Sequence, residues 1–380
     1  MNRYILCRNA LEELGIADIT YTCGDDSELS SYSDKSEKDF HKICKSLELK
    51  GYQTYSATDK NGNHFATYVL DNSLMHVYWL KEMQELTIIS SDSAGASLPP
   101  EKPEVTDGAH DTTVTQLCDT EHNNGMGYVI QLADGSFIIY DGAYGSQSEV
   151  LYRTLSELNG GEEGIHIVAW LITHNHEDHS DCFPDFTFKY SELVELDYVL
   201  AAPLKEVNNA SWYKRLKMYT GKYQGAKLVT VHTGMEFAFC NLKMEILFAP
   251  DDLYKHEMQS NFNTSSVVSR LCSEDSSFLV LADATKESGE FMLDVYGSYL
   301  ESNICQVSHH GVEDMPFAFY DVVKASTLFY PCNQELYDLQ SRADDVRKAL
   351  READYTKEIL IAGNGQYTCT LERQDGDGGE

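Results

Sequence analysis

Six consecutive residues constrain this chain more than any other feature of its sequence. Positions 174 to 179 read His-Asn-His-Glu-Asp-His, and they follow the nearly continuous apolar run HIVAWLIT. Such a run is typical of a buried strand, so the polar residues emerge at its carboxyl end, on a rigid support. His174, His176, Asp178 and His179 therefore offer the imidazole and carboxylate donors that divalent transition metals prefer.

The spacing of these residues predicts two metal ions rather than one. His174 and His176 can face one ion, whereas Asp178 and His179, displaced by the turn into a following helix, can face a second. Two ions about 3.5 to 4 Å apart would hold a bridging hydroxide with a pKa near 7, which provides a nucleophile at neutral pH. We expect two divalent ions, zinc above all, with manganese or iron as alternatives. Unrelated surface histidines are the simpler alternative, but the density of the grouping argues against it.

The run THNHEDH resembles the signature of the metallo-β-lactamase superfamily, and further segments match that family's order. FIIYDGAYG is similar to its early strand-end motif, FLVLADA to the strand that carries a bridging aspartate, and VSHHGV to its last histidine motif. The resemblance implies that Asp141 orients the metal-binding loop, that Asp283 bridges the ions, and that His309 or His310 binds the second ion. It covers about residues 112 to 372, and THNHEDH is its most specific part.

The resemblance gives a set of expected metal ligands and two expected catalytic residues. The expected ligands are His174, His176, Asp178, His179, Asp283 and His309. Asp178 and His310 are expected to act in catalysis. Which of His309 and His310 is the ligand stays open at this point.

The chain departs from the family pattern at the first metal site. Many members place a further histidine roughly twenty residues before the bridging aspartate, where this chain has Asn261 and Asn263. We therefore expect looser binding of the first ion, with the solitary His232 and His256 as candidate replacements. His122, in the loop CDTEHNNGMG, is a candidate substrate contact, although a plain loop histidine is the simpler interpretation.

The composition changes at residues 92–108, which collect Ser, Gly, Asp and three of the eight prolines. We expect a linker there, between a small α+β domain at residues 1–91 and a hydrolase domain at residues 109–373. The polar, Gly-rich tail at 374–380 is expected to be disordered. The fold class is α/β, and the resemblance implies a four-layer αββα metallo-β-lactamase sandwich after the N-terminal domain.

Local patterns predict the main elements of both parts. Apolar residues from Phe40 to Leu47 repeat at helical spacing, and Asn61-Gly62 is a typical hairpin turn between two strands. The runs LMHVYWL and ELTIIS favour a second strand pair. After the linker, VTQLCDT, GYVIQL and SFIIYDG predict a β-meander.

The formal charge of -32 disfavours nucleic acid as a partner, because a broad negative field repels polyanions. One basic cluster could soften this, although a solvated helix face is the simpler interpretation. The cluster comprises Lys205, Lys214, Arg215, Lys217, Lys222 and Lys227. We expect a small-molecule substrate, no membrane span and, since the first residues lack the features of a secretory signal, a cytoplasmic protein. The oligomeric state stays open.

Within the superfamily, NTSSVVSRL, LVLADA and QVSHHGV are similar to the hydrolase domain of competence-type DNA-uptake proteins and their soluble relatives. Phosphorylcholine esterases of related fold are a further comparison. These resemblances imply hydrolysis of a phosphoric ester. Hydrolysis of a lactone or thioester is the main alternative, and a non-catalytic binding protein with a degenerate metal site is another. A redox di-iron protein is less favoured, because that branch has H-x-E-x-D-H and this chain has His176 at the Glu position.

Overall fold

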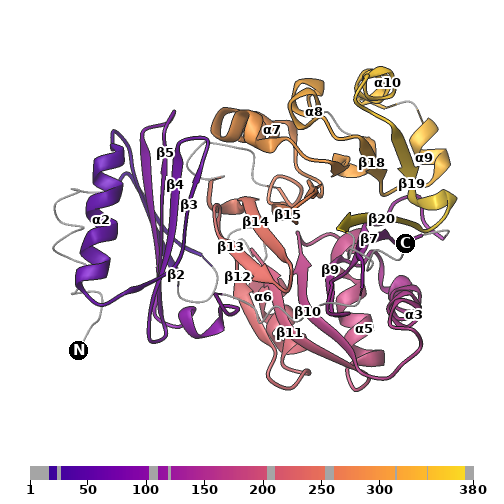
Figure 1. Ribbon diagram of the computed structural model, residues 1–380, viewed down its shortest axis with the longest axis horizontal. Coiled ribbons are helices and arrows are strands. Elements are labelled where there is room, and N and C mark those ends of the chain that lie inside the picture. The colour runs from indigo at the N-terminus through magenta and orange to yellow at the C-terminus, as the bar shows by residue number, and fades with distance from the viewer. Residues whose placement is uncertain are drawn as a thin grey trace, which may run out of the picture.

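Three β-sheets organise the part of the chain that the computed structural model describes (Figure 1). The described residues are 17–23, 27–101, 110–118, 121–202, 210–252, 261–312, 315–339 and 341–372. One sheet has six strands, and the other two have seven strands each. Within these ranges no helix combines the length and the apolar character needed to cross a bilayer.

The six-stranded sheet is antiparallel throughout and has the order β1-β2-β6-β5-β4-β3. Its strands are β1 (Ile19–Cys23), β2 (Ser27–Tyr32), β3 (Gln53–Lys60), β4 (Asn63–Leu70), β5 (Ser73–Leu80) and β6 (Glu85–Ser91). Asn61 and Gly62 connect β3 to β4 with φ of 57° and 78°, as the tight-turn prediction requires. The two predicted strand pairs are confirmed, whereas β1 and β2 add to the predicted elements.

Helix α2 (Glu37–Leu49) covers one face of this sheet, as the helical spacing predicted. The Asp39 carboxylate accepts a hydrogen bond from the Ser36 N–H at 2.9 Å, which satisfies a backbone donor at the start of the helix. The buried face from Phe40 to Leu47 packs against Val77 and its neighbours in the sheet. Apolar contact therefore holds α2 in place along its whole length.

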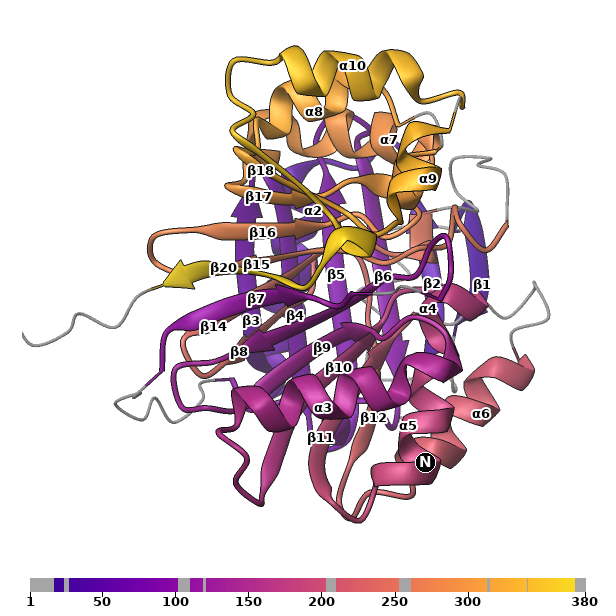
Figure 2. The ribbon, with the colours of Figure 1, turned by 90° about the vertical axis from the view of Figure 1, so that its right-hand side faces the viewer.

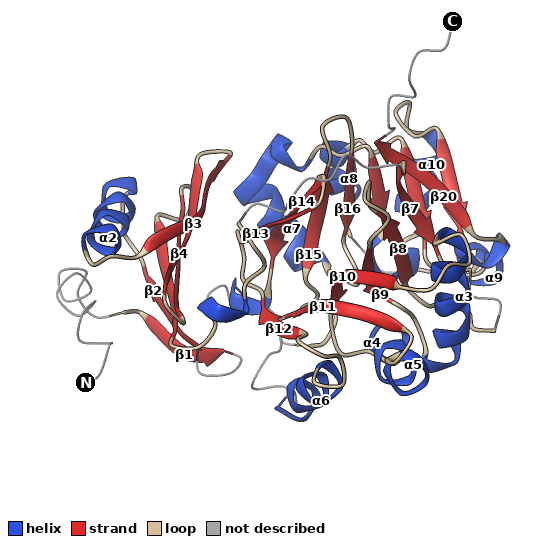
Figure 3. Ribbon diagram, turned by 60° about the horizontal axis from the view of Figure 1, so that its bottom comes forward, coloured by secondary structure: helices blue, strands red, loops and turns tan. Residues whose placement is uncertain are grey.

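The two seven-stranded sheets pack face to face and carry helices on their outer faces (Figures 2 and 3). The first sheet contains β7 (Thr112–Gln116), β8 (Gly127–Gln131), β9 (Phe137–Asp141), β10 (Ile165–Ile172), β11 (Val194–Ala201), β12 (Lys227–Thr230) and β20 (Tyr367–Glu372). The second contains β13 (Glu236–Phe239), β14 (Leu242–Phe248), β15 (Val268–Cys272), β16 (Ser277–Val280), β17 (Ile304–Gln306), β18 (Thr327–Tyr330) and β19 (Glu358–Ile361). Strands β7, β8 and β9 pair in sequence and antiparallel, which confirms the predicted meander.

Different helices cover the two outer faces. On the first sheet lie α3 (Ser148–Leu158), α4 (Glu177–Ser180), α5 (Cys182–Tyr190) and α6 (Ala210–Thr220). With the second sheet lie α7 (Lys286–Tyr296), α8 (Phe317–Val323), α9 (Gln334–Asp338) and α10 (Asp344–Glu352). One buried cluster fills the space between the two sheets. A second lies between the first sheet and its helices, and a third between the second sheet and its helices. The α/β fold class and the four-layer αββα order are those that the sequence analysis predicted.

The N-terminal sheet packs its second face against the sandwich, so α2 lies on the far side (Figure 1). Phe65 and Tyr78 share a buried cluster with Phe248 and Tyr296 of the sandwich. The rings of Phe65 and Tyr296 stack with centroids 6.3 Å apart. Of the predicted linker, residues 102–108 lie outside the described residues, as does the predicted tail at 374–380. The domain boundaries themselves stay predictions.

Candidate metal centre

Three segments that are far apart in the sequence meet at the ends of strands β10, β16 and β17. Strand β10 runs parallel to β9, and β16 runs parallel to β17, so the segments that follow them leave from the carboxyl ends of parallel strands in each sheet. The segment after β10 carries residues 174–179, the segment after β16 carries Asp283, and the segment after β17 carries His309 and His310. The sandwich therefore supplies a rigid support for all of these side chains.

Asp141, at the end of β9, holds the loop that follows β10. Its side chain is fully buried, and its backbone φ is 52°. Its Oδ1 atom accepts a hydrogen bond from the Thr173 N–H at 2.7 Å, and Oδ2 accepts one from the Thr173 hydroxyl at 2.8 Å. Oδ2 also lies 2.7 Å from Nδ1 of His179. This contact fixes the imidazole ring, so Nε2 is the His179 atom that faces the centre.

The two carboxylate oxygens of Asp283 face different histidines. Oδ1 lies 3.1 Å from Nε2 of His179 and 3.6 Å from Nε2 of His310. Oδ2 lies 3.7 Å from Nε2 of His174 and 3.6 Å from Nε2 of His309. The side chain of Asp283 is 1% exposed, so it sits between the two sets of rings and out of contact with solvent.

Two groups of donor atoms share this aspartate. Asp178, His179, Asp283 and His310 form one group, and His174, His176 and Asp283 form the other. The atoms of each group lie within 4.8 Å of one another; for example, Nε2 of His310 is 3.0 Å from Oδ2 of Asp178. A divalent ion with bonds of about 2.0 to 2.2 Å holds its ligand atoms roughly 3 to 4 Å apart. Both groups therefore come close to the spacing that such an ion requires.

Several buried atoms of the centre lie close to other donor atoms but form no aligned hydrogen bond among the described residues. They are Nε2 of His179, Nε2 of His310, both side-chain oxygens of Asp283 and Oδ1 of Asn263. A buried polar atom without a partner costs roughly 1 to 3 kcal/mol, so such atoms are rare unless a ligand or ion satisfies them. Their convergence between the two groups fits metal ions as the missing partners.

The charges of the centre favour a cation. Burial lowers the pKa of His174 and of His176, which keeps both imidazoles in the neutral form that binds metals. Burial opposes the charge on Asp283, but the nearby His179 and His310 hold its pKa well below the usual range. The buried carboxylate is therefore ionised, and a positive charge beside it is strongly favourable.

The structure separates the two consecutive histidines that the sequence left equivalent. Both have left-handed backbone angles, with φ of 48° for His309 and 55° for His310, which turns their rings in different directions. His310 belongs to the group around Asp178, and its Nδ1 donates to the Pro331 carbonyl at 2.7 Å. His309 is part of neither group; its side chain is 20% exposed and lies at the edge of the centre.

The two asparagines at the expected histidine position have different surroundings. The Asn261 side-chain oxygen accepts a hydrogen bond from the Thr264 N–H at 2.8 Å, so it stabilises its own turn. Asn263 reaches the centre, where its Nδ2 lies 3.2 Å from Nε2 of His309. The group of His174 and His176 thus has Asn263 and His309 beside it, but no third histidine of the described residues belongs to it.

The two candidate replacement histidines do not enter the centre. His232 is buried elsewhere, with Nδ1 2.9 Å from Oδ1 of Asp251 and its ring stacked on that of His76. His256 lies outside the described residues. His122 stacks on Tyr144 with ring centroids 4.0 Å apart, one layer away from the ligands.

Asn124, which no sequence pattern singled out, links this outer layer to the centre. Its Nδ2 donates to Oδ2 of Asp178, and its Oδ1 accepts a hydrogen bond from the Tyr144 hydroxyl at 3.1 Å. The carbonyl of Asp178 in turn accepts from the Met126 N–H at 2.9 Å. Asn124 lies in a polar loop without a strand or motif to mark it, so only the folded chain shows its contact.

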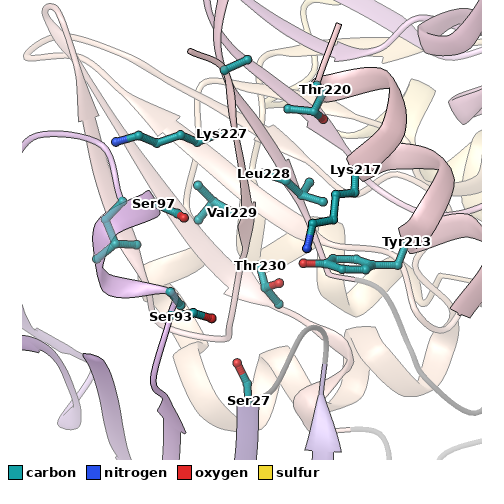
Figure 4. Close-up of a pocket in the computed structure, with 14 residues that line it drawn as sticks. Ser27, Ser93, Ser97, Tyr213, Lys217, Thr220, Lys227, Leu228, Val229 and Thr230 are labelled. Atoms are coloured by element: carbon teal, nitrogen blue, oxygen red, sulfur yellow. The ribbon is translucent and has the colours of Figure 1, made fainter. Parts of the chain in front are cut away.

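The basic cluster lies partly around a separate cavity between the N-terminal sheet and α6 (Figure 4). This cavity has a volume of about 520 Å³, and Lys217, Lys227 and Tyr213 line it. The Lys227 ammonium donates to the Ala96 carbonyl at 2.9 Å. Lys205 of the cluster lies outside the described residues. No residue of the metal centre lines this cavity.

Solved structures with a similar fold include metallo-β-lactamase-fold proteins. The metallo-beta-lactamase fold protein YhfI from Bacillus subtilis has 13% identity and a TM-score of 0.46, over 68% of this chain and 100% of that one. CmlA, a diiron β-hydroxylase from Streptomyces venezuelae, has 13% identity and a TM-score of 0.44, over 69% of this chain and about half, 54%, of that one. The metallo hydrolase Igni18 from Ignicoccus hospitalis has 11% identity and a TM-score of 0.41, over 69% and 100%. Similarity at this level concerns the fold alone.

No protein-family model and no curated protein matches the chain.

Proposed function

We propose that this chain, an αββα sandwich of the metallo-β-lactamase type, is a metal-dependent hydrolase that acts on a phosphoric ester. One observation carries the proposal: the two oxygens of Asp283 face two separate groups of metal-binding side chains. A carboxylate in this position can bridge two ions. When bound, a pair of divalent ions supplies Lewis acidity and lowers the pKa of water toward neutrality.

Charge supports an anionic substrate over a neutral one. Two divalent ions carry four positive charges, and the ligands Asp178 and Asp283 offset two of them. A bridging hydroxide would offset one more, so about one positive charge would remain to attract an anion locally, against the repulsion of the overall charge of -32. A phosphoric ester carries the negative charge that fits such a site, and a lactone or thioester does not.

The chain's own residues would position the ligands and restrict their motion. Asp141 and Thr173 hold the loop that carries His179. Gln306, which is fully buried, accepts hydrogen bonds from the N–H groups of Leu281 and Ala282 at 2.8 and 2.6 Å. These bonds fix the turn immediately before Asp283. Ligand side chains must be held in fixed positions if a metal centre is to react efficiently, and these hydrogen bonds hold them.

The two ions are expected to bind with different affinities. The group around Asp178 has four donor residues, whereas the group of His174 and His176 has three, counting Asp283 in both. Fewer protein ligands leave more of an ion's coordination to water and reduce its affinity. Titration of metal-free protein with zinc, followed by calorimetry, should therefore resolve a tighter and a weaker site. His174→Ala should weaken the second step and leave the first largely unchanged.

The proposed activity can be tested on purified protein loaded with zinc, manganese or iron. The substrates are bis(p-nitrophenyl) phosphate, p-nitrophenyl phosphate and a homoserine lactone. We expect turnover of a phosphate ester, and we expect Asp283→Asn to lower kcat/KM on the order of 1,000-fold, since bound metals contribute several kcal/mol. Asp275→Asn, an exposed aspartate on the turn between β15 and β16, is the matched control and should behave as the unmodified chain.

Three results would contradict the proposal. Turnover of the lactone but of neither phosphate ester would indicate that the protein hydrolyses a carbonyl substrate instead. Fewer than one bound ion per chain after loading, with no turnover of any substrate, would indicate a binding protein with a degenerate centre. Bound metal that Asp283→Asn does not release would contradict the bridging position of this carboxylate.

A further inference from the structure

A second cluster of metal-binding side chains lies on the N-terminal sheet, on the side away from the sandwich. Glu37 and His41 are one helical turn apart on α2, and His64 is on β4. Their ligand atoms lie within 4.8 Å of one another. Figure 1 shows α2 at the outer end of the molecule, so this cluster shares no residue or element with the centre at the ends of β10, β16 and β17.

The distances within the cluster fit a single ion. Oε1 of Glu37 lies 3.4 Å from Nε2 of His41 and 3.5 Å from Nε2 of His64. A zinc ion with bonds of about 2.0 to 2.2 Å in tetrahedral geometry separates its ligand atoms by roughly 3.3 to 3.6 Å. Both imidazoles thus approach the same carboxylate oxygen at the spacing of neighbouring ligands.

The environment of His64 leaves its Nε2 directed at the cluster. Oδ2 of Asp59 lies 3.2 Å from Nδ1 of His64, so a carboxylate stands beside the imidazole nitrogen that faces away from Glu37. The His64 ring also stacks between Phe40 and Trp79, with ring centroids 5.4 and 5.6 Å away. A carboxylate on one imidazole nitrogen and a metal on the other is the usual arrangement of histidine ligands, because it fixes the tautomer and the ring.

Two imidazoles and one carboxylate form a donor set that suits zinc better than it suits magnesium or calcium. A cavity of about 500 Å³ lies beside the cluster and is lined by His41, Asp59 and His64. It gives an ion access and leaves room for water in a fourth coordination position. The side chain of His64 is 18% exposed, whereas that of His41 is 61% exposed, so the cluster is closed on the sheet side and open toward solvent.

We propose that Glu37, His41 and His64 bind one zinc ion, with Asp59 as the residue that orients His64. The ion would connect the first two turns of α2 to β4, in addition to the apolar contacts of the helix. This site is independent of the proposed hydrolase centre, because the two have no ligand in common.

The test uses crystals of the full chain grown with zinc, with anomalous diffraction measured on both sides of the zinc absorption edge. We expect a peak about 2.0 to 2.2 Å from Nε2 of His41, Nε2 of His64 and Oε1 of Glu37. The same maps report the hydrolase centre separately, so failure at one site is distinguishable from failure at the other. Absence of a peak at the three side chains would overturn the inference.

Zinc content in solution gives an independent readout. We expect His41→Ala to bind one zinc ion fewer per chain than the unmodified protein after dialysis against zinc, and to gain less in Tm when zinc is added. His41 is exposed, so this change should not disturb folding. The matched control is His166→Ala, because the His166 side chain is partly exposed, at 39%, and contacts a carboxylate, Asp197, but belongs to no metal-binding group of the described residues. Equal zinc content in His41→Ala and the unmodified chain would contradict the site.

Discussion

We expect His76 to make the free energy of unfolding decrease as the pH falls, and a substitution of this one residue should reveal the effect. It is fully buried on β5, where its Nε2 donates to the Thr233 carbonyl at 2.8 Å and its Nδ1 accepts from the Thr67 hydroxyl at 2.9 Å. Burial, reinforced by the nearby His232, lowers the pKa of His76 to about 4 from 6.5. Because this histidine lies between the N-terminal sheet and the sandwich, its protonation acts on their contact.

The sign and size follow from linkage. In the unfolded chain His76 takes up a proton near pH 6.5, whereas in the folded chain it does so only near pH 4. The unfolded state therefore binds more protons between these values, and stability falls as the pH decreases from 6.5 to 4. At 1.36 kcal/mol per pKa unit the full loss is roughly 3 kcal/mol, with about 1 kcal/mol lost by pH 5.5 and about 2 to 3 kcal/mol by pH 4.5.

The assay is urea unfolding of the unmodified chain and of His76→Gln at pH 7, 5.5 and 4.5. Glutamine can donate to Thr233 and accept from Thr67, but it does not titrate. We expect the variant to be less stable at pH 7 and the difference to shrink by about 2 to 3 kcal/mol at pH 4.5. His166→Gln is the control with opposite sign: a hydrogen bond to Asp197 raises the pKa of His166, so that difference should grow as the pH falls. A constant difference between His76→Gln and the unmodified chain at all three pH values would refute the reasoning.

Three further predictions concern residues that support the fold and the centre. Asp141→Asn should weaken metal affinity about 10- to 100-fold in a chelator competition, because His179 loses its carboxylate partner; unchanged affinity would contradict this. Gly234→Ala should lower the free energy of unfolding by about 2 to 4 kcal/mol, since φ is +89° and the added Cβ would lie 1.8 Å from Phe65. Unchanged stability in urea would show that the Phe65 ring can move aside at no cost. Lys60→Met should cost about 1 to 3 kcal/mol in the same assay, because the buried glutamates lose one cationic partner but keep Lys243 and Arg270; a stabilised variant would contradict this.

Much of the fold could be predicted because its elements have strong local patterns. The β4 and β5 runs are apolar and separated by turn residues, and α2 repeats its apolar side chains at helical spacing. The β2 segment SELSSY is rich in serine and has no apolar alternation, so its pairing with β6 depends on the sheet that it joins. The packing of the N-terminal sheet against the sandwich was not predictable either. A lysine in a sequence is expected at the surface, but Lys60 is buried between the sheet and the sandwich, where it pairs with Glu236.

The candidate centre was predictable only where its residues are adjacent in the sequence. His174 to His179 follow one strand, so their spacing already indicates a metal-binding loop. The different positions of His309 and His310 depend on two consecutive left-handed backbone angles, which no sequence pattern marks. The contact of Asn124 with Asp178 joins loops from different parts of the chain, and such contacts are set by the tertiary fold.

The two proposed metal sites differ in what the chain loses when the ion leaves. In the hydrolase centre Asp283 is 1% exposed, so without an ion its charge is balanced by the nearby His179 and His310 and not by bulk water. On α2 the side chains of Glu37 and His41 are 56% and 61% exposed, so water solvates them when no ion is bound. Because crowded charged and polar groups are costly where water cannot reach them, removal of metal should destabilise the sandwich as a whole, whereas loss of the outer ion should loosen α2 alone. Hydrogen exchange of the metal-free chain would distinguish these effects, since amides of β10 and β16 and amides of α2 report on them separately.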